Sequence, residues 1–516
     1  MSTEVELKLA LPAAALRKAE RLGWLRKLAR APVAHDDITS TYFDTKGRKL
    51  QRHGVTLRVR RNGAKHIQTI KGLNGGPALS RFEREDEVAS ARPRLKYAKD
   101  TPLEALVTPA LKRKLRPVFR TQVQRRVMTV GLNGSEIELA FDHGKVLAGK
   151  RGQPLHELEL ELKRGHARDV ARLARRLRKA VPIAFGARAK SERGYALAEG
   201  RADGAVRAAP IALEAQQSVA SAFAQIGFSC LQHLAANEDA VLAGDAEGVH
   251  QMRVGLRRLR AAISLFGDLP QGRDLAAIKR DLKWLTGELG PARDLDVLAT
   301  EAITPLRKEN PEQREIKLLE ADVRRARHAE FGRARAAVAS PRYRDVVLQT
   351  ALWLIDGDWC HAGGFAAKGG AAAQRRDGAI APVAAEILKR RARKVIKKTR
   401  RLKALDAAHR HKLRIGVKKL RYGCDFFATL FGRPQAQRRY DKALKRLQDC
   451  LGRLNDIRVH AEKAHQLANP KRRAPRGAPK AYAMGFLTGR EQRLAPALVA
   501  AAARAGRKLA QARKFW

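Results

Sequence analysis

Glu4-Val5-Glu6-Leu7-Lys8 alternates charged and aliphatic side chains, and the stretch Glu159-Leu160-Glu161-Leu162-Lys163 repeats the pattern. Successive side chains of a β-strand point to opposite faces of the sheet. Each stretch therefore predicts a strand with two carboxylates and an ammonium group on one face and aliphatic groups on the other. One such strand is typical of an ordinary sheet with a solvated face, but two copies that end in the same lysine favour a specific role for the charged face.

Other candidate strands place both signs of charge on shared faces. Arg58 and Arg60 are in phase, Lys71 ends the stretch 67–71, and the in-phase acids are Glu83, Glu85, Glu87, Glu136, Glu138 and Asp142. Carboxylates hold divalent cations, whereas Arg and Lys neutralise phosphates. We therefore expect a closed antiparallel sheet whose charged face looks inward onto a polyanion and whose aliphatic outer face is covered by helices.

The pattern of apolar residues predicts the elements of this first region. An Asn133-Gly134 pair is a strong hairpin signal between two of the strands. The strands are expected at Ile38–Asp44, Val55–Arg61, His66–Lys71, Arg81–Val88, Val118–Leu132, Ser135–Asp142 and Leu155–Lys163. The helices are expected at Pro12–Arg30, Thr101–Lys114 and Ala167–Ala180.

The composition favours a polyanionic partner. The 516 residues carry a formal net charge of +53, and the sequence pI is about 11.1. Nucleic acid, an anionic membrane surface and polyphosphate all fit this charge, although coding bias toward arginine would also produce it. Aromatic residues make up only 5%, which argues against a single-stranded nucleic-acid binder because such proteins stack bases on aromatic rings.

The cysteines and the hydropathy pattern predict a cytoplasmic protein. The cysteines, Cys230, Cys360, Cys424 and Cys450, are widely spaced and form no CxxC or Cys/His ligand cluster. No apolar run approaches the roughly 18 residues of a membrane span. The N-terminus leads directly into the first strand, without the pattern of a signal peptide.

A helical pattern begins near residue 211, after a Gly- and Ala-rich linker at 201–210, and it contains an internal repeat. The segment from His250 to Arg260 recurs in register from His411 to Arg421, and an LGxxRD-like element follows each copy, ending at Asp294 and Asp456. We expect two related halves, at about 211–360 and 375–516, each forming a four-helix bundle.

Each repeat carries a row of cations along one face of its helix. At about 100° per residue, one narrow arc holds His250, Arg253, Arg257 and Arg260 in the first copy and His411, Arg414, Lys418 and Arg421 in the second. Surface helices normally mix both signs of charge, so an anion site is favoured over a solvated face. The nearby cations should keep the histidines neutral, although both could instead be packing residues at the helix start. The two aspartates could bind a metal but are better explained as helix caps or partners of arginine.

These motifs resemble two known families. The ExExK of Glu4–Lys8, the LRxR of Leu57–Arg60, the TIKG of Thr69–Gly72, the ELELELK of Glu157–Lys163 and the KSERGY of Lys190–Tyr195 make residues 1–200 similar to a CYTH domain of the triphosphate tunnel metalloenzymes. This resemblance implies an eight-stranded antiparallel tunnel that binds triphosphate with two divalent cations, Mg²⁺ or Mn²⁺, and cleaves a phosphoanhydride bond. Residues 211–516 resemble a CHAD domain, a helical family associated with inorganic polyphosphate.

The resemblance implies roles for individual residues. The expected metal ligands are Glu4, Glu6, Asp142, Glu159 and Glu161, with Glu138 as a weaker candidate, and Glu6 would also position the attacking water. The expected catalytic and phosphate-binding residues are Glu4, Glu6, Lys8, Lys71, Arg58, Arg60, Arg125, Lys163, Lys190 and Arg193. Where the family often has Lys-x-Arg, this chain has Val123-Gln124-Arg125. The expected polyphosphate ligands are His250, Arg253, Arg257, Arg258, Arg260, His411, Arg414, Lys418, Lys419 and Arg421.

The sequence thus favours a metal-dependent inorganic triphosphatase, which cleaves tripolyphosphate to pyrophosphate and phosphate and is recruited to polyphosphate by its helical half. A polyphosphate-binding or granule-associated protein with little turnover is the alternative. Thiamine triphosphatase, nucleoside triphosphatase and adenylate cyclase activities are further alternatives, although no aromatic cluster that could read adenine lies near the motifs. The intact ExExK and ELELELK favour the enzyme, because a pure polyanion binder has no use for carboxylates without metals.

Overall fold

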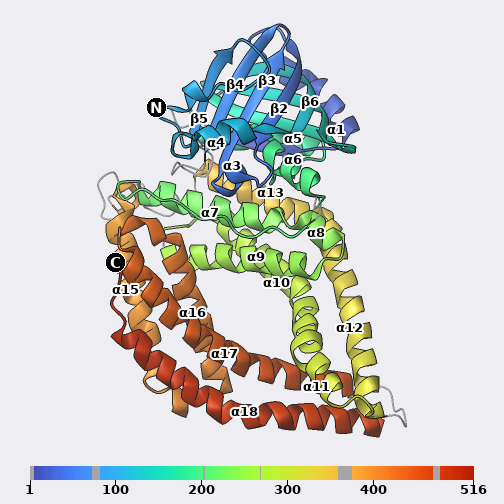
Figure 1. The fold of residues 1–516 in the computed structure, drawn as a ribbon, viewed down its shortest axis with the longest axis vertical. Coiled ribbons are helices and arrows are strands. Elements are labelled where there is room, and N and C mark those ends of the chain that lie inside the picture. Colours follow the sequence, from blue (N-terminus) through green and yellow to red (C-terminus); the bar gives the residue numbers. More distant parts are fainter. Residues whose placement is uncertain (1–4, 73–81, 201–203, 268, 358–374, 469–476) are drawn as a thin grey trace.

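The chain forms a curved β-sheet domain that sits on a helical domain (Figure 1). This computed structural model describes residues 5–72, 82–200, 204–267, 269–357, 375–468 and 477–516. No helix in these ranges is both long enough and apolar enough to span a bilayer.

Nine antiparallel strands form one sheet in the order β5-β4-β3-β2-β6-β7-β8-β1-β9. Their bounds are β1 Val5–Ala10, β2 Ala34–Asp44, β3 Val55–Asn62, β4 Lys65–Gly72, β5 Phe82–Val88, β6 Arg116–Leu132, β7 Ser135–Ala148, β8 Arg151–Arg164 and β9 Ala184–Phe185. The sheet curls into a tunnel, as predicted. The two-residue β9 is an addition, and among the described strands no ladder joins β5 to β1.

The aliphatic faces of the strands point outward and are covered, which confirms the inverted arrangement of the barrel. Leu7 and Leu160 belong to a core that includes α1 (Ala13–Glu20) and α5 (Ala167–Ala180). On the opposite side, Leu57 and Ile70 share a second core with Leu111 of α4 (Pro109–Lys114) and Leu50 of α3 (Lys49–Arg52). The charged faces of the strands are thereby left for the interior.

Two of the predicted helices are broken. The stretch Pro12–Arg30 forms α1 and the short α2 (Gly23–Arg26), and the chain between them runs through Arg21 and Leu22. The stretch Thr101–Lys114 forms a 3₁₀ turn and then α4, because Pro109 occupies the first helical position and the Thr108 hydroxyl accepts the amide of Leu111. A further helix, α6 (Lys190–Glu199), covers one mouth of the sheet.

The two helical repeats share the helices of the repeated segments but differ in their other described elements. The first comprises α7 Val219–Ala235, α8 Glu238–Leu242, α9 Ala246–Phe266, α10 Arg273–Val297, α11 Thr304–Glu309, α12 Arg314–Ala339 and α13 Pro341–Asp356, with a π-helical stretch at Leu298–Ile303. The second comprises α15 Ile380–Thr399, α16 Ala407–Phe426, α17 Pro434–Ala468 and α18 Gly477–Gln511. The repeated cationic segments lie on α9 and α16, which begin after the capping residues Asp245 and Asp406.

Several direct contacts join the two domains. Helix α5 of the sheet domain packs on α13 of the helical domain. Arg178 of α5 lies 2.7 Å from Asp345, and Arg188 donates a hydrogen bond of 2.7 Å to the carbonyl of Ala236. The apolar core beneath β1 and β8 continues into α7 and α13, so the two domains share one packed interface.

Candidate functional site

The curved sheet encloses a polar cavity of about 530 Å³. The strands supply its lining because residues two apart share the inner face. The lining residues are Glu6, Lys8, Tyr42, Thr56, Arg58, Arg60, Lys71, Glu83, Glu85, Arg125, Glu138, Glu159, Glu161, Lys163, Phe185, Gly186, Ala189, Lys190, Ser191, Phe228 and Gln232. We call this the tunnel cavity.

One wall of the tunnel cavity is acidic. In the strand register Glu161 of β8 lies opposite Glu138 of β7 on one side and opposite Glu6 of β1 on the other, so the three carboxylates form a row. Lys163 lies 2.8 Å from Glu161, and Lys8 lies 2.6 Å from Glu159 in the next row. Such a row of hard oxygen donors is the ligand set that Mg²⁺ and Mn²⁺ prefer.

The wall formed by β3, β4 and β5 is richer in cations. Lys71 lies 2.6 Å from Glu83, and Arg58 lies 3.6 Å from both Glu83 and Glu85. The Nε atoms of Arg58 and Arg60 are buried without a hydrogen-bond partner. Burial and the neighbouring Arg58 lower the pKa of both Arg60 and Lys71. This wall therefore holds crowded positive charge and free donors that a bound anion would satisfy.

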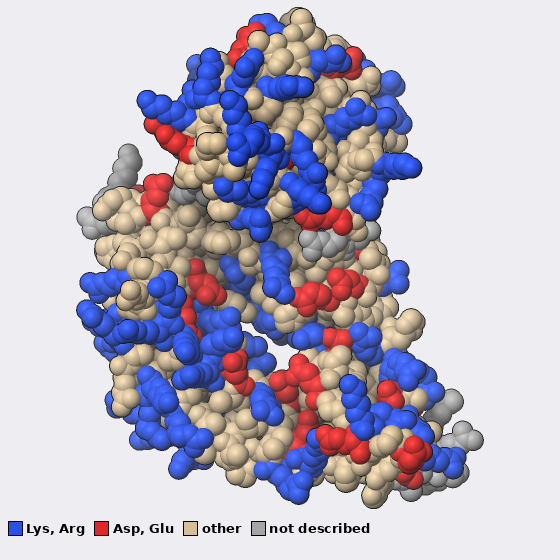
Figure 2. Space-filling model, viewed as in Figure 1, with Lys and Arg blue, Asp and Glu red and all other residues tan. Residues whose placement is uncertain are grey.

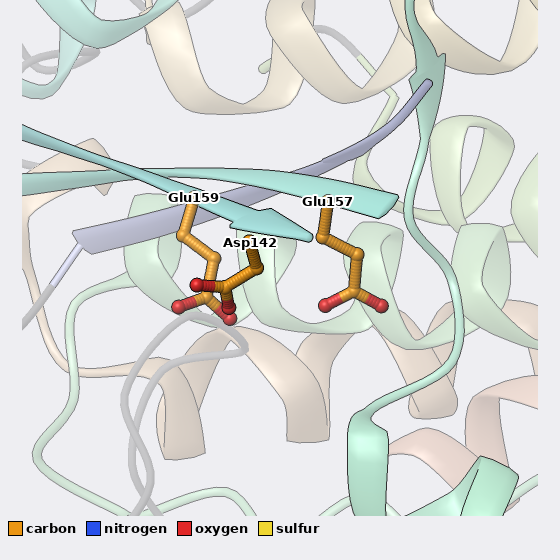
Figure 3. Close-up of side chains that lie close together, drawn as sticks. All are labelled: Asp142, Glu157 and Glu159. Atoms are coloured by element: carbon orange, nitrogen blue, oxygen red, sulfur yellow. The ribbon is translucent and has the colours of Figure 1, made fainter. Parts of the chain in front are cut away.

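Behind the tunnel cavity, Asp142, Glu157 and Glu159 bring their carboxylates together (Figure 3). Lys190 of α6 lies 2.9 Å from Asp142 and 2.8 Å from each of the other two. Arg125 adds contacts of 2.6 Å to Asp142 and 2.8 Å to Glu159. Burial alone would raise the pKa of Glu159, but Lys190, Lys8 and Arg125 hold it well below the usual value. Glu159 therefore stays ionised, and the ammonium group of Lys190 lies among the three acids, where a metal would otherwise sit.

The residues implied by the resemblance divide into three groups. Glu4 lies outside the described residues. Asp142 is fully buried, and neither it nor Arg193 lines the tunnel cavity; Arg193 instead lies 3.2 Å from Glu157 and donates to the carbonyl of Pro154. The remaining ones line it together: Glu6, Lys8, Arg58, Arg60, Lys71, Arg125, Glu138, Glu159, Glu161, Lys163 and Lys190.

Some lining residues were not predicted. Glu83 and Glu85 were expected on the inward charged face but were given no role in the site, whereas Thr56, which is in phase with Arg58, was not named as a site residue. Burial lowers the pKa of Arg58 and Tyr42 raises it. Tyr42 was missed because the prediction relied on charged residues and tyrosine is uncharged. Phe228 and Gln232 come from the helical domain, and only the tertiary structure brings them here.

A second cavity, of about 420 Å³, lies between the two helical repeats, and we call it the cleft. Arg253 and Arg257 of α9 enter it from one side, and Arg414 and Lys418 of α16 enter it from the other. The remaining lining residues are His250, Val254, Arg258, Arg293, Asp294, Val297, Glu301, Arg421, Tyr422, Asp425, Gln448, Asn455, Asp456, Val459 and His460. Figure 2 shows Lys and Arg gathered on the left edge of the opening in the helical domain.

Burial and mutual repulsion lower the pKa values of cations in the cleft. Burial lowers the pKa of Arg253 to about 10, with Arg257, Arg293 and Arg414 adding to the effect and Asp294, 3.6 Å away, opposing it. Burial, Arg414 and Arg257 lower the pKa of Lys418 to about 7.

Two further observations on the cleft agree with an anion site. The pKa of His250 is lowered by burial and by arginines, as predicted. The Nε atoms of Arg257 and Arg414 are buried without a partner. A bound anion would stabilise the charge of these groups.

Other expected polyphosphate ligands have different surroundings. Arg260 donates to Thr286, Lys419 donates to Ser264, and His411 contacts the side-chain oxygen of Asn455 at 2.7 Å; none of the three lines the cleft. Arg258 does line it, but it is 9% exposed and its guanidinium lies 5.3 Å from the ring centroid of Phe426. Asp294 and Asp456 lie inside α10 and α17 rather than at helix caps.

Comparisons with known proteins match the two regions separately. A family model described as CYTH domain matches residues 2–195, and one described as CHAD domain matches residues 225–465. The chain is 31% identical over 207 residues to an inorganic triphosphatase of Haemophilus influenzae. That match covers 38% of this chain and 55% of the relative, so the chain spans about half the length of this curated protein.

Solved structures give likenesses to each region. A CHAD domain from the plant Ricinus communis shares 31% identity at a TM-score of 0.51, covering 60% of this chain and 97% of its own. A putative adenylyl cyclase from Hippeastrum, described as having a dominant triphosphatase activity, shares 19% identity at a TM-score of 0.29, covering 37% of this chain and 95% of its own.

Proposed function

The chain is a protein with an N-terminal CYTH domain and a C-terminal CHAD domain, and we propose that it is a metal-dependent triphosphatase that hydrolyses inorganic tripolyphosphate to pyrophosphate and phosphate. One observation carries the proposal: the row of Glu6, Glu161 and Glu138 and the cations Arg58 and Arg60 line the same cavity. Carboxylates would repel a polyanion unless divalent cations lay between the two. The similarity to an inorganic triphosphatase supports the same activity.

The cationic wall would bind the substrate. Arg58 and Arg60 have unpartnered Nε groups that can each donate to a phosphate oxygen. Lys71 and Glu83 lie on the same inner face. When phosphate binds, the ammonium group of Lys71 would contact a phosphate oxygen as well as the carboxylate of Glu83. These donors also stabilise the charge that builds up on the oxygens as the phosphoanhydride bond breaks.

The acidic row would hold Mg²⁺ or Mn²⁺, and we propose two such ions. Glu6, Glu161 and Glu138 fit this role because their carboxylates adjoin one another on neighbouring strands inside the tunnel cavity. When bound, the ions would neutralise the charge of the phosphates and make a bound water a stronger nucleophile than bulk water. Glu6 would orient that water and accept its proton, since its carboxylate is on the inner face and only partly engaged by Lys8.

The buried cluster positions these groups. Because Lys190 and Arg125 both pair with Asp142, we assign Asp142 to holding Arg125 and Lys190 rather than to binding a metal. Arg125 is thereby fixed at the edge of the tunnel cavity with its guanidinium toward Glu159. Arg193 holds α6 on β8 in the same way.

We propose that the helical domain binds long-chain inorganic polyphosphate in the cleft. Arg253, Arg257, Arg414 and Lys418 face it from both repeats. Burial, Arg414 and Arg257 lower the pKa of Lys418 to about 7, and a bound anion would reverse this shift. A protein that binds polyphosphate without turnover is the second candidate function, and the cleft alone would suffice for it.

Turnover separates these candidates. Phosphate release should be measured with Mg²⁺ or Mn²⁺ on tripolyphosphate, ATP, thiamine triphosphate and long-chain polyphosphate side by side. We expect tripolyphosphate to give the highest kcat/KM. Binding of tripolyphosphate without release of phosphate from any of the four would support the second candidate and contradict the first.

A further inference from the structure

The wall of the tunnel cavity is not made by the sheet domain alone. Phe228 and Gln232 of α7 line it together with the charged residues of the strands. The two residues lie one helical turn apart and so share one face of α7. In Figure 1, α7 runs directly beneath the barrel. One wall of the cavity therefore belongs to the helical domain.

Contacts beside the cavity fix α7 in this position. Arg188 donates from Nε and Nη2 to the carbonyl of Ala236, at the end of α7, over 3.1 and 2.7 Å. Two residues further along, Lys190 is held by the buried carboxylates. The amide of Gly186 donates to the carbonyl of Lys8 over 2.8 Å. The segment from Gly186 to Lys190 thus ties the end of α7 to both the buried carboxylates and β1.

The chemistry of this wall differs from that of the rest of the cavity. Phe228 is 1% exposed and offers only hydrocarbon, which cannot replace the hydration of a phosphate oxygen. Gln232 is half-buried and neutral, and its side-chain amide has no hydrogen-bond partner within the described part of the chain. An anion that extends toward α7 therefore meets one free neutral donor and then an apolar barrier.

We propose that α7 limits the length of the phosphate chain that the tunnel cavity accepts. The terminal phosphoryl group of a short linear inorganic phosphate abuts Phe228 and accepts a hydrogen bond from the Nε2 of Gln232, and longer chains cannot extend past this point. Gln232 is then a specificity-determining residue supplied by the helical domain. This inference rests on the proposed hydrolysis of tripolyphosphate and deepens it, since it restricts the substrates of the tunnel to short chains.

Two substitutions of Gln232 test the idea, one that keeps the size of the side chain and one that changes it. Gln232→Glu places a carboxylate where the terminal phosphate oxygens would lie, and it should raise the KM for tripolyphosphate about tenfold while kcat changes little. Gln232→Ala removes the donor and shortens the side chain, so it should raise kcat/KM for linear tetrapolyphosphate relative to tripolyphosphate by about fivefold. The control is Ala243→Glu, which adds the same charge at an exposed residue after α8 and should leave both constants unchanged.

A binding measurement separates failure of this inference from failure of the proposed function. Imidotriphosphate, in which N–H groups replace the bridging oxygens of tripolyphosphate, is titrated calorimetrically into protein with Mn²⁺. Every sample carries Arg414→Glu to weaken binding in the cleft. Binding by Gln232→Glu should be weaker than by the Ala243→Glu control. Equal affinities and unchanged KM values would overturn the role of α7 even if the enzyme turns over tripolyphosphate. Absence of turnover in the wild-type protein would contradict the proposed function, whereas weaker binding by Gln232→Glu would still support the contact with α7.

Discussion

The ammonium group of Lys190 lies 2.8 Å from the carboxylate of Glu159, and it also contacts Asp142 and Glu157. A side chain from α6 thus takes the place that a metal ion would occupy among three buried acids. Removing one partner of a buried ion pair leaves the others without compensation, which is costly.

Lys190→Met should therefore destabilise the fold. Methionine keeps the length of the side chain but not its charge, so we expect a loss of about 3–5 kcal/mol in the free energy of unfolding. Because the three carboxylates present oxygens within 4.8 Å of one another, Mn²⁺ should bind there in the variant and restore part of the loss. Denaturant unfolding with EDTA and with Mn²⁺ measures both effects.

Lys150→Met is the matched control, because Lys150 is exposed in the turn between β7 and β8. It should change the free energy of unfolding by about 0.5 kcal/mol or less. Equal stability of the two variants, or equal stabilisation of both by Mn²⁺, would contradict the role given to Lys190.

The cleft predicts different outcomes for two arginines that the helical periodicity treats alike. Arg414 lines the cleft and its pKa is lowered by burial and by Arg257, whereas Arg260 donates to Thr286 outside it. Arg414→Ala should weaken binding of long-chain polyphosphate about tenfold and flatten its dependence on salt, because fewer counterions are released. Arg260→Ala should leave both nearly unchanged. Equal losses in the two variants would show that binding follows the helix surface rather than the cleft.

Binding in the cleft should take up protons. The pKa of Lys418 is lowered to about 7 by burial, Arg414, Arg257 and Arg253, with only Asp456 opposing them. An anion restores the charged form of this group, so at pH 8 polyphosphate binding should be coupled to proton uptake and should weaken as pH rises above 7. Calorimetry in buffers of different ionisation enthalpy measures the uptake, and Lys418→Met should lack most of it. The same uptake by the variant would refute the assignment.

The same group makes stability depend on pH in a definite direction. Between pH 7 and the ordinary lysine value of 10.5, the unfolded chain keeps a proton on Lys418 that the folded chain has lost. The unfolded state then binds more protons, so this group makes the free energy of unfolding rise with pH across that window.

The alternation of charge and hydrocarbon predicted which faces of the strands look inward, because a period of two residues depends only on backbone geometry. It therefore identified Glu6, Arg58 and Glu161 as neighbours in one cavity. It could not distinguish Asp142 from them, since the side chain that neutralises this acid comes from α6 and not from the sheet. Phe228 and Gln232 were missed for a similar reason, because they belong to a separate domain.

The sequence repeat predicted which helices of the helical domain correspond, but not which of their cations line the cleft. Register between the two copies predicted that α9 and α16 correspond, and both begin after an aspartate cap. The crossing of α10 over α9 and of α17 over α16 determines which cations of each row enter the cleft. Arg414 lines the cleft, whereas Arg260 donates to Thr286 outside it. Periodicity along one helix contains no information about that crossing.

The central claim is that acids and cations in one cavity are made compatible by divalent metal and phosphate together. The most direct test is the affinity of metal-stripped protein for tripolyphosphate, measured with and without Mn²⁺, in the wild type, Glu161→Gln and Glu87→Gln, since Glu87 is exposed outside the tunnel cavity. We predict that Mn²⁺ tightens binding at least about tenfold in the wild type and Glu87→Gln but not in Glu161→Gln. Binding that is equally tight without metal, or equally metal-dependent in Glu161→Gln, would contradict the account.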